Sequence, residues 1–198
     1  MNKIVLATTN KGKIKELQSL LSSLNLQIIS IDDLDKTLEV IEDQDTFAGN
    51  ALKKATAYME YTGLPAIADD SGLCVDYLNG EPGVYSARFA GENSTDQDNN
   101  NKLLILLDDV PVNSRTAHFT SAIALVMPNG EKHVVEGECK GIITRESVGD
   151  NGFGYDPLFF VPEANKTFAQ MDDDQKNKVS HRGKAFTKLY DLMSTIWQ

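Results

Sequence analysis

The sequence predicts a mixed α/β fold, in which a central mixed β-sheet is flanked by helices. Near the N-terminus a short apolar run leads through a polar loop into an amphipathic helix, and a second helix leads into another apolar run before residue 70. Residues 115–143 instead alternate apolar and polar side chains around an Asn-Gly turn, which is typical of antiparallel strands. We therefore expect parallel and antiparallel strands in one sheet.

The composition is that of a globular protein with an acidic surface. A chain of 198 residues suits one domain, or one domain with two lobes, and can bury a proper core. Nineteen basic and twenty-nine acidic residues give a net charge of −10. This charge disfavours nucleic acid and anionic membranes as partners, but a small anionic ligand is compatible with it where basic residues are concentrated.

Cysteine spacing and hydropathy point to a reducing, cytoplasmic location. Cys74 and Cys139 lie far apart in the sequence and form neither a zinc motif nor a disulfide framework. The N-terminal apolar run turns polar too soon for a signal peptide, and no run of 18 apolar residues is present. We therefore expect no membrane association.

The first strand is expected at residues 4–8, and a helix follows with one apolar stripe. The stripe consists of Ile14, Leu17, Leu21 and Leu24. A strand, a glycine-containing loop and a helix in this order present backbone N–H groups to an anion. Lys13 in the first turn opposes the helix dipole, which is easier to explain if a phosphate neutralises it. The alternative is an ordinary turn with a surface lysine.

An acidic stretch at residues 39–45 precedes the second helix. Most such charges are solvated, although one of Glu39, Glu42, Asp43 and Asp45 could reach a metal held at Asp70. The helix itself is expected from about Thr46 to Tyr61, with Gly63 as its stop.

The apolar run at residues 64–68 stops on two adjacent carboxylates, Asp69 and Asp70. A run of this kind reads as a buried strand whose C-terminal end is a favoured ligand site. The two charges repel each other by about 1 kcal/mol even with strong screening, so a cation beside them is expected, and Mg²⁺ prefers such ligands. The alternative is a solvated turn, in which Ser71 and Gly72 supply the bend.

The middle of the chain predicts short strands, a loop and a further helix. Residues 73–75 read as a short strand, and Thr95 is expected to cap a helix that reaches residue 107. Arg88 lies between aromatics in the loop, where packing competes with a ligand role. Strands follow at 115–127, 131–136 and about 138–143; His118 and His133 within them are read as structural or exposed.

Residues 149–157 form a loop of three glycines around two aromatic side chains. Its backbone can approach a flat ring closely, so Phe153 or Tyr155 could stack on a base, and Asp156 could accept a donor. The alternative is a turn that leads into a strand at 158–161.

The C-terminal segment gathers basic groups in an otherwise acidic chain. They are Lys176, Lys178, His181, Arg182, Lys184 and Lys188. Ser180 is a plausible N-cap for the last helix, so the residues after it would add positive charge to the helix start. This reversal of charge suggests an anion pocket.

Together these features describe a nucleoside triphosphate held through its base, its phosphates and Mg²⁺. No Ser-His-Asp or Cys-His arrangement suggests a covalent intermediate. Two other classes stay open: a regulator that binds the nucleotide without hydrolysing it, and a phosphosugar phosphatase that releases orthophosphate. A nucleic-acid binder is disfavoured by charge.

Five blocks of the sequence resemble the inosine/xanthosine triphosphate pyrophosphatase family, which hydrolyses non-canonical purine nucleotides. The blocks are residues 8–13, 68–73, 83–88, 152–157 and 180–182. They follow the family's order from about residue 3 to 190, and the combination is specific where a single block would not be. At two positions after Glu42 the chain departs from the family, because Gln44 and Gly49 stand where a glycine and an acid are common.

The resemblance implies a single pyrophosphatase domain, 1–198, with two lobes around an active-site cleft, and a homodimer. It implies Mg²⁺-dependent cleavage of ITP, dITP or XTP to the monophosphate and pyrophosphate, which cleanses the nucleotide pool. Asp70 would be the catalytic base and a metal ligand, with Glu42 and Asp69 as further metal carboxylates. The substrate would be bound by Thr8, Thr9, Asn10, Lys11, Gly12, Lys13, Ser71, Phe153, Gly154, Tyr155, Asp156, Lys176, His181 and Arg182.

Overall fold

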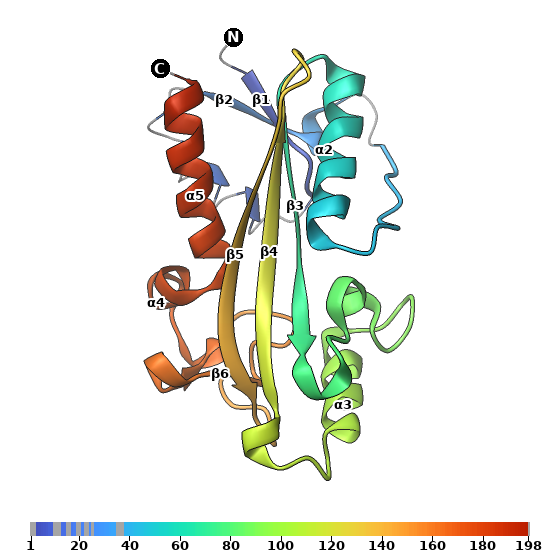
Figure 1. Cartoon of the computed structure of the whole chain (residues 1–198), viewed down its shortest axis with the longest axis vertical. Coiled ribbons are helices and arrows are strands. Elements are labelled where there is room, and N and C mark those ends of the chain that lie inside the picture. Colours follow the sequence, from blue (N-terminus) through green and yellow to red (C-terminus); the bar gives the residue numbers. More distant parts are fainter. Residues whose placement is uncertain are drawn as a thin grey trace. The chain divides into compact units, whose positions relative to one another are not determined.

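The computed structural model describes residues 3–9, 13–14, 17–18, 21, 24, 26–34 and 38–197 (Figure 1). Its strands are β1 (Lys3–Leu6), β2 (Gln27–Ser30), β3 (Ala66–Val75), β4 (Thr116–Val126), β5 (Lys132–Ile143), β6 (Phe159–Val161) and β7 (Lys166–Thr167). The longer helices are α2 (Phe47–Thr62), α3 (Asp96–Leu106), α4 (Asp173–Val179) and α5 (His181–Ile196). Within this described part, no helix is long and apolar enough to cross a membrane.

The strands form one mixed sheet in the order β2-β1-β3-β4-β5-β6-β7. Strand β1 is parallel to both β2 and β3, whereas β6 is antiparallel to β5 and β7. The predicted mixed α/β class is therefore confirmed.

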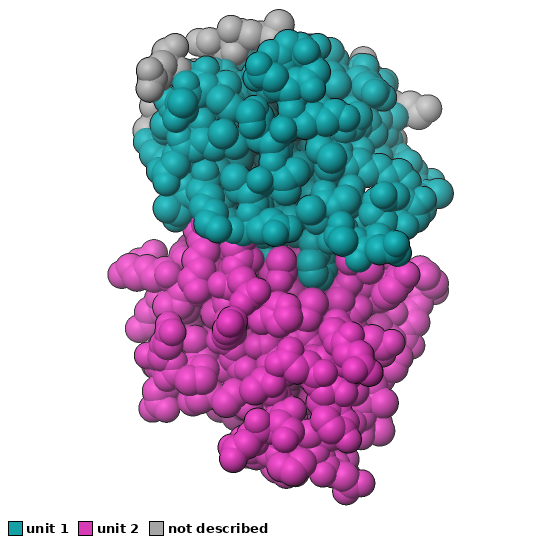
Figure 2. Space-filling model, in the orientation of Figure 1, with its two compact units in different colours: residues 1–70, 121–136, 185–198 teal, residues 71–120, 137–184 magenta. Residues whose placement is uncertain are grey.

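The chain divides into two compact units, which Figure 2 colours separately. Unit 1 comprises residues 1–70, 121–136 and 185–198, and unit 2 comprises residues 71–120 and 137–184. Each unit has hydrophobic cores of its own. The expectation of one domain with two lobes around a cleft stays a prediction.

Unit 1 buries both faces of its strands. Alternate side chains of a strand point to opposite faces, so Ile4 and Leu6 of β1 pack into one core while Val5 and Ala7 belong to another. The first core includes side chains of α5, and the second includes alanines of α2, whose small size permits close helix–sheet packing. Figure 1 accordingly shows these two helices on opposite sides of the strands.

Unit 2 is organised around three phenylalanines. The rings of Phe119, Phe159 and Phe168 meet at centroid distances of 4.7–5.8 Å. Phe119 comes from β4, Phe159 from β6 and Phe168 from the short helix after β7, so the cluster ties three segments together. Ring contacts of this kind add to the energy of apolar burial.

Two predicted strand breaks are wrong. Strand β3 does not stop at Asp69 but continues to Val75, because β4 borders it beyond the point where β1 ends. Strand β5 likewise runs through Gly137 without a break. A hydrogen-bonded neighbour thus overrides the local turn signals in both strands.

Several local predictions are confirmed at helix ends. Thr46 accepts the Gly49 N–H at 3.0 Å and caps α2, whose stop is Gly63 in the left-handed conformation (φ 66°). Thr95 caps α3 as expected, and α5 begins directly after Ser180. The short helix α4 was not predicted. In the N-terminal segment Leu17 and Leu21 are buried as expected, whereas Asn10, Lys11 and Gly12 lie outside the described residues.

Candidate functional site

A pocket of about 140 Å³ lies within unit 2. Every site residue predicted beyond Asp70 lines it, namely Ser71, Phe153, Gly154, Tyr155, Asp156, Lys176, His181 and Arg182. The sequence places these residues in four separate segments, which the fold of unit 2 brings together. The pocket is smaller than the roughly 300 Å³ or more of a site for a drug-sized ligand, so it suits one moiety such as a nucleotide base.

Two cationic or potentially cationic side chains at the start of α5 are held against aromatic rings. The imidazole of His181 stacks on Phe119 with a centroid distance of 4.7 Å and an interplanar angle of 11°. The guanidinium carbon of Arg182 lies 5.5 Å from the Phe153 ring centre. Both side chains are less than a tenth exposed. The donors expected from the sequence therefore lie in a desolvated setting, where unpaired polar groups are costly.

Gly183 allows α4 and α5 to meet closely at this point. A Cβ at position 183 would lie 1.8 Å from the carbonyl oxygen of Asn177 in α4. Only glycine fits this approach, which keeps the first turn of α5 beside the end of α4.

Lys176 and Asp156 form an ion pair at the pocket. The ammonium lies 2.5 Å from Asp156 Oδ2, and the same oxygen accepts the backbone N–H of Phe153 at 2.9 Å. Lys176 also lies 5.0 Å from the Phe153 ring centre, whereas Lys178 is exposed and lines no part of the pocket. Of the two lysines, the structure therefore places Lys176 at the site.

The two aromatic side chains of the loop play different parts. Tyr155 is buried, and its hydroxyl donates to the carbonyl oxygen of Ser86 at 2.9 Å. Burial raises the pKa of the Tyr155 hydroxyl, because the charged phenolate would be poorly solvated. Phe153 is 53% exposed. Phe153 is thus the more accessible of the two rings.

Three residues on α3, at or next to the pocket, were not predicted as site residues. Asp96 and Asn99 line the pocket, and Asn100 is buried behind it. Asn99 accepts the Ala90 N–H at 2.7 Å and donates to the Ala87 carbonyl oxygen at 3.1 Å. The run of asparagines at 99–101 was the only sequence signal.

Within unit 1, the aspartate pair lies on β3 rather than on a turn. Because successive strand residues face opposite sides, Asp69 and Asp70 have different surroundings. Asp69 is 4% exposed and lies 2.5 Å from the Lys13 ammonium. Asp70 Oδ2 accepts from Nδ2 of Asn50 at 3.0 Å, and Asn50 is itself fully buried on α2. Asn50 was not predicted as a site residue.

The acidic stretch before α2 is paired with lysines of that helix. Glu42 forms a close ion pair with Lys54, and Asp43 lies 2.7 Å from Lys53. The hydrogen bond from Lys53 is the main reason that the pKa of the Asp43 carboxyl is lowered. Lys54 also lines a hollow of about 200 Å³ together with two predicted phosphate-loop residues, Thr8 and Thr9.

The Asp70 carboxylate fits a magnesium ion that takes most of its ligands from substrate and water. Magnesium is commonly held by one or two carboxylates, with substrate phosphates and water completing its shell. Among the residues described, no three Asp, Glu, His or Cys side chains gather closely enough to hold a metal. Asp70 fits the open type of site, since its amide donor Asn50 orients the carboxylate without adding positive charge.

The basic cluster of the C-terminal segment does not form one pocket. Lys184 donates to the carbonyl oxygen of Glu138 at 2.9 Å, and Lys188 donates to that of Glu136 at 2.7 Å. Arg88, whose role was left open, lies 5.1 Å from the Tyr85 ring centre and 3.9 Å from Glu92. The expected anion pocket is thus reduced to the three groups in the unit 2 pocket.

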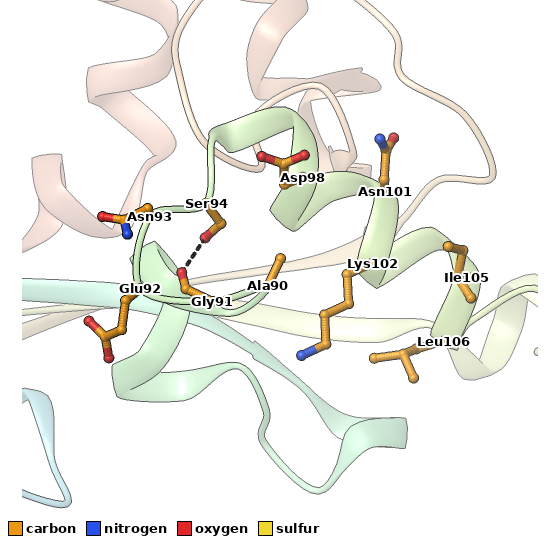
Figure 3. Close-up of a pocket in the computed structure, with 10 residues that line it drawn as sticks. All are labelled: Ala90, Gly91, Glu92, Asn93, Ser94, Asp98, Asn101, Lys102, Ile105 and Leu106. Carbon is orange, nitrogen blue, oxygen red and sulfur yellow. Dashed lines mark hydrogen bonds between the residues drawn. The ribbon is translucent and has the colours of Figure 1, made fainter.

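A larger hollow of about 570 Å³ lies beside α3 but carries none of the predicted site residues (Figure 3). Two of its polar side chains form hydrogen bonds with nearby backbone. Ser94 donates to the Gly91 carbonyl oxygen at 2.8 Å, and Lys102 donates to that of Phe89 at 2.5 Å. The smaller pocket, where predicted residues converge, is the better candidate.

Comparison with known proteins finds relatives that cover nearly the whole chain. A protein called dITP/XTP pyrophosphatase from Desulforamulus reducens is 55% identical over 195 residues, which cover 98% of this chain and 97% of the relative. The protein of the same name from Geobacter sulfurreducens is 50% identical over 198 residues, covering 100% and 98% of the two chains.

Two solved structures that resemble this one are both of Ham1 proteins. The Ham1 protein of Staphylococcus aureus has a TM-score of 0.91 at 40% identity and covers 98% of both chains. The HAM1 protein of Coxiella burnetii has a TM-score of 0.93 at 41% identity, covering 98% of this chain and all of the other. Residues 4–192 match the sequence pattern of the Ham1 family, and the chain therefore belongs to that family.

Proposed function

We propose that this chain hydrolyses non-canonical purine nucleoside triphosphates, namely ITP, dITP and XTP, to the monophosphate and pyrophosphate. The observation that carries the proposal is the unit 2 pocket, where predicted base- and sugar-binding residues converge in a member of the Ham1 family. Its curated relatives bear the name dITP/XTP pyrophosphatase. Removing such nucleotides would keep them out of DNA and RNA.

Base choice follows from hydrogen-bond chemistry. Inosine and xanthosine carry a 6-oxo acceptor where adenine carries an amino donor, and a guanidinium such as that of Arg182 can only donate. Leaving a buried donor unpaired costs about 1–3 kcal/mol, which corresponds to at least about fivefold discrimination against adenine. Phe153 supplies a ring face on which a base can stack.

The reaction is a hydrolysis at the α-phosphorus. Asp70 accepts a proton from the attacking water, whose oxygen forms a bond to the α-phosphorus as the bond to the bridging oxygen breaks. Pyrophosphate then leaves. Asn50 keeps the Asp70 carboxylate oriented during this step. Thr8, Thr9, Lys13 and the loop residues 10–12 are proposed to bind the triphosphate, as the N-terminus of a helix favours anions.

Magnesium is the proposed cofactor, and Asp70 would hold it. The family resemblance adds Glu42 and Asp69, but the three carboxylates do not form a metal cluster among the described residues. When bound, the metal neutralises phosphate oxygens and so favours attack by water. Two of these carboxylates have lysine partners in the structure, Glu42 with Lys54 and Asp69 with Lys13. When substrate and metal bind, the ammonium groups of Lys54 and Lys13 would leave these carboxylates and pair with phosphate oxygens.

The remaining parts of the proposal concern assembly and location. By resemblance to its family the chain is proposed to form a homodimer and to act in the cytoplasm on a small-molecule substrate. Light scattering of the purified protein would distinguish a dimer of about twice 21.8 kDa from a monomer.

The test is Mg²⁺-dependent release of pyrophosphate from ITP, XTP, GTP and ATP. We expect turnover of ITP and XTP, little of ATP, and none after complete chelation. Asp70→Asn should lower kcat by about 10²- to 10⁴-fold with an unchanged far-UV circular dichroism spectrum. Release of orthophosphate would favour a phosphatase, and tight binding without turnover would favour a regulator.

A further inference from the structure

We propose that Asp96 and Asn100 of α3 are positioning residues that set the shape of the base pocket by holding the Gly154 peptide. Oδ2 of Asp96 accepts the Gly154 N–H at 2.7 Å, and Nδ2 of Asn100 donates to the Gly154 carbonyl oxygen at 2.9 Å. Residues four apart lie on the same face of a helix. One face of α3 thus forms hydrogen bonds with both backbone polar groups of a single glycine.

The held glycine stands between the two aromatic walls of the pocket. Gly154 has a positive φ of 60°, and Phe153 and Tyr155 flank it. Tyr155 is also fixed by burial and by its hydrogen bond to Ser86. Phe153 is half exposed, so the position of its ring depends on the backbone on either side of it. Asp156 accepts the N–H of Phe153, and Asp96 of α3 accepts the N–H of the next residue, Gly154.

The burial of Asn100 supports a role beyond stability. Its side chain is 5% exposed, yet Oδ1 has no hydrogen-bond partner among the described residues. Burying an amide with one polar atom unsatisfied is unfavourable, and an apolar side chain at this position would avoid the cost. The hydrogen bond from Nδ2 of Asn100 reaches the pocket loop, 54 residues away in sequence.

The same helix also holds a second segment that lines the pocket, at Ala87. Asn99, between the two positioning residues, binds the backbone of Ala87 and Ala90. The first two turns of α3 therefore form side-chain hydrogen bonds with two segments that line the pocket. This rests on the proposed function, since it takes the pocket to be the base site.

Loss of the hydrogen bonds predicts a specific kinetic change. Contacts with the base are present both in the bound substrate and in the transition state, so loosening them raises KM and leaves kcat largely unchanged. Loss of one hydrogen bond is expected to raise KM for ITP by about three- to tenfold. A role limited to folding would instead lower the active fraction, which reduces apparent kcat and leaves KM unchanged.

The experiment compares Asp96→Ala and Asn100→Ala with Asn101→Ala. Asn101 is exposed, lies on the neighbouring hollow (Figure 3) and accepts from Gln97, so it is a matched control on the same helix. We measure KM and kcat for ITP, together with amide hydrogen exchange of a peptide covering 150–157. Asp96 is exposed, so its alanine variant should fold. Asp96→Asn keeps an oxygen that can accept from Gly154, so its KM for ITP should rise less than that of Asp96→Ala.

A raised KM with unchanged kcat, together with faster exchange in 150–157, supports the proposal. Unchanged KM and exchange in both alanine variants would overturn it, as would a fall in kcat alone. The proposed function fails separately, if the unmodified protein does not hydrolyse ITP. In that event hydrogen exchange, which needs no substrate, still decides whether α3 holds the loop.

Discussion

The ammonium of Lys176 and the carboxylate of Asp156 lie 2.5 Å apart, and both side chains are largely buried, with exposed fractions of 16% and 5%. Because Asp156 also accepts the Phe153 N–H, this pair joins α4 to the loop at 152–156. The ion pair therefore links stability to the shape of the pocket.

Breaking this pair should destabilise the protein. Lys176→Met leaves the Asp156 carboxylate without its cation, and removing one partner of a buried pair costs about 3–5 kcal/mol. We expect about 3 kcal/mol in the free energy of unfolding, because Lys176 retains some exposure. Urea denaturation measures this loss in the free energy of unfolding. The control is Lys178→Met, at an exposed position of the same helix, where a change under about 0.5 kcal/mol is expected. Equal effects of the two variants would contradict the prediction.

Two glycines of the same loop should respond differently to alanine. Both Gly152 and Gly154 have positive φ, 78° and 60°, so either substitution costs about 1–2 kcal/mol of backbone strain. A Cβ at 152 would lie 2.0 Å from Asp156 Oδ2, whereas nothing lies within 4 Å of one at 154. Gly152→Ala should therefore cost about 1–3 kcal/mol more than Gly154→Ala in urea denaturation. Similar losses would show that Asp156 moves aside without cost.

The features predicted correctly are those determined by local sequence. The ends of α2 follow from Thr46 and Gly63, whose capping geometry involves only adjacent turns. Residues 153–156 and 181–182 stood out in the sequence because glycine–aromatic spacing and cations at a helix start are unusual. They line the unit 2 pocket, and their role in substrate binding stays a prediction. Both signals lie within a few residues.

The features missed depend on contacts between distant segments. Strand β3 continues past Asp69 because β4, about 50 residues later, borders it. Asn50 bonds to Asp70 across 20 residues, and Asp96 bonds to Gly154 across 58. A polar residue on a helix carries no local sign of a partner so far away, so these positioning residues could not be recognised from the sequence.

The two departures from the family pattern are in contact, which suggests that they compensate each other. A Cβ at Gly49 would lie 2.9 Å from Cβ of Gln44. Gly49→Glu alone should therefore destabilise by about 1–3 kcal/mol through overpacking. In a Gln44→Gly background the same change should stabilise by up to about 1 kcal/mol, since it replaces a helical glycine near the N-terminus with an acid. A double-mutant cycle measures the coupling, and additive effects would contradict it.

The N-cap of α3 predicts a pH-dependent stability. Hydrogen bonds from the Thr95 side chain and then from its backbone lower the pKa of the Asp98 carboxyl below 3.8. A group whose pKa is lower in the folded state stabilises above its unfolded pKa, and this contribution is lost as the pH falls through the folded value. Asp98→Asn should therefore lower Tm at pH 7, and the difference from wild type should shrink below about pH 4. A difference that stays constant with pH, measured by circular dichroism, would refute this assignment.

Asn50 should matter for the proposed catalysis, although it lines neither the unit 2 pocket nor the hollow beside Thr8 and Thr9. Its amide donates to Asp70 and accepts the Gln44 N–H at 2.9 Å, so Asn50→Asp keeps the shape but turns a donor toward Asp70 into an acceptor. The Asp70 carboxylate, which is the proposed base, is then misaligned, and kcat for ITP should fall about tenfold to a hundredfold with little change in KM. The free energy of unfolding should fall by about 1–3 kcal/mol. Asn101→Asp, the same change at an exposed position, should leave kcat and the free energy of unfolding unchanged. A kcat that survives Asn50→Asp would mean that Asp70 is oriented by other contacts, or that it is not the catalytic base.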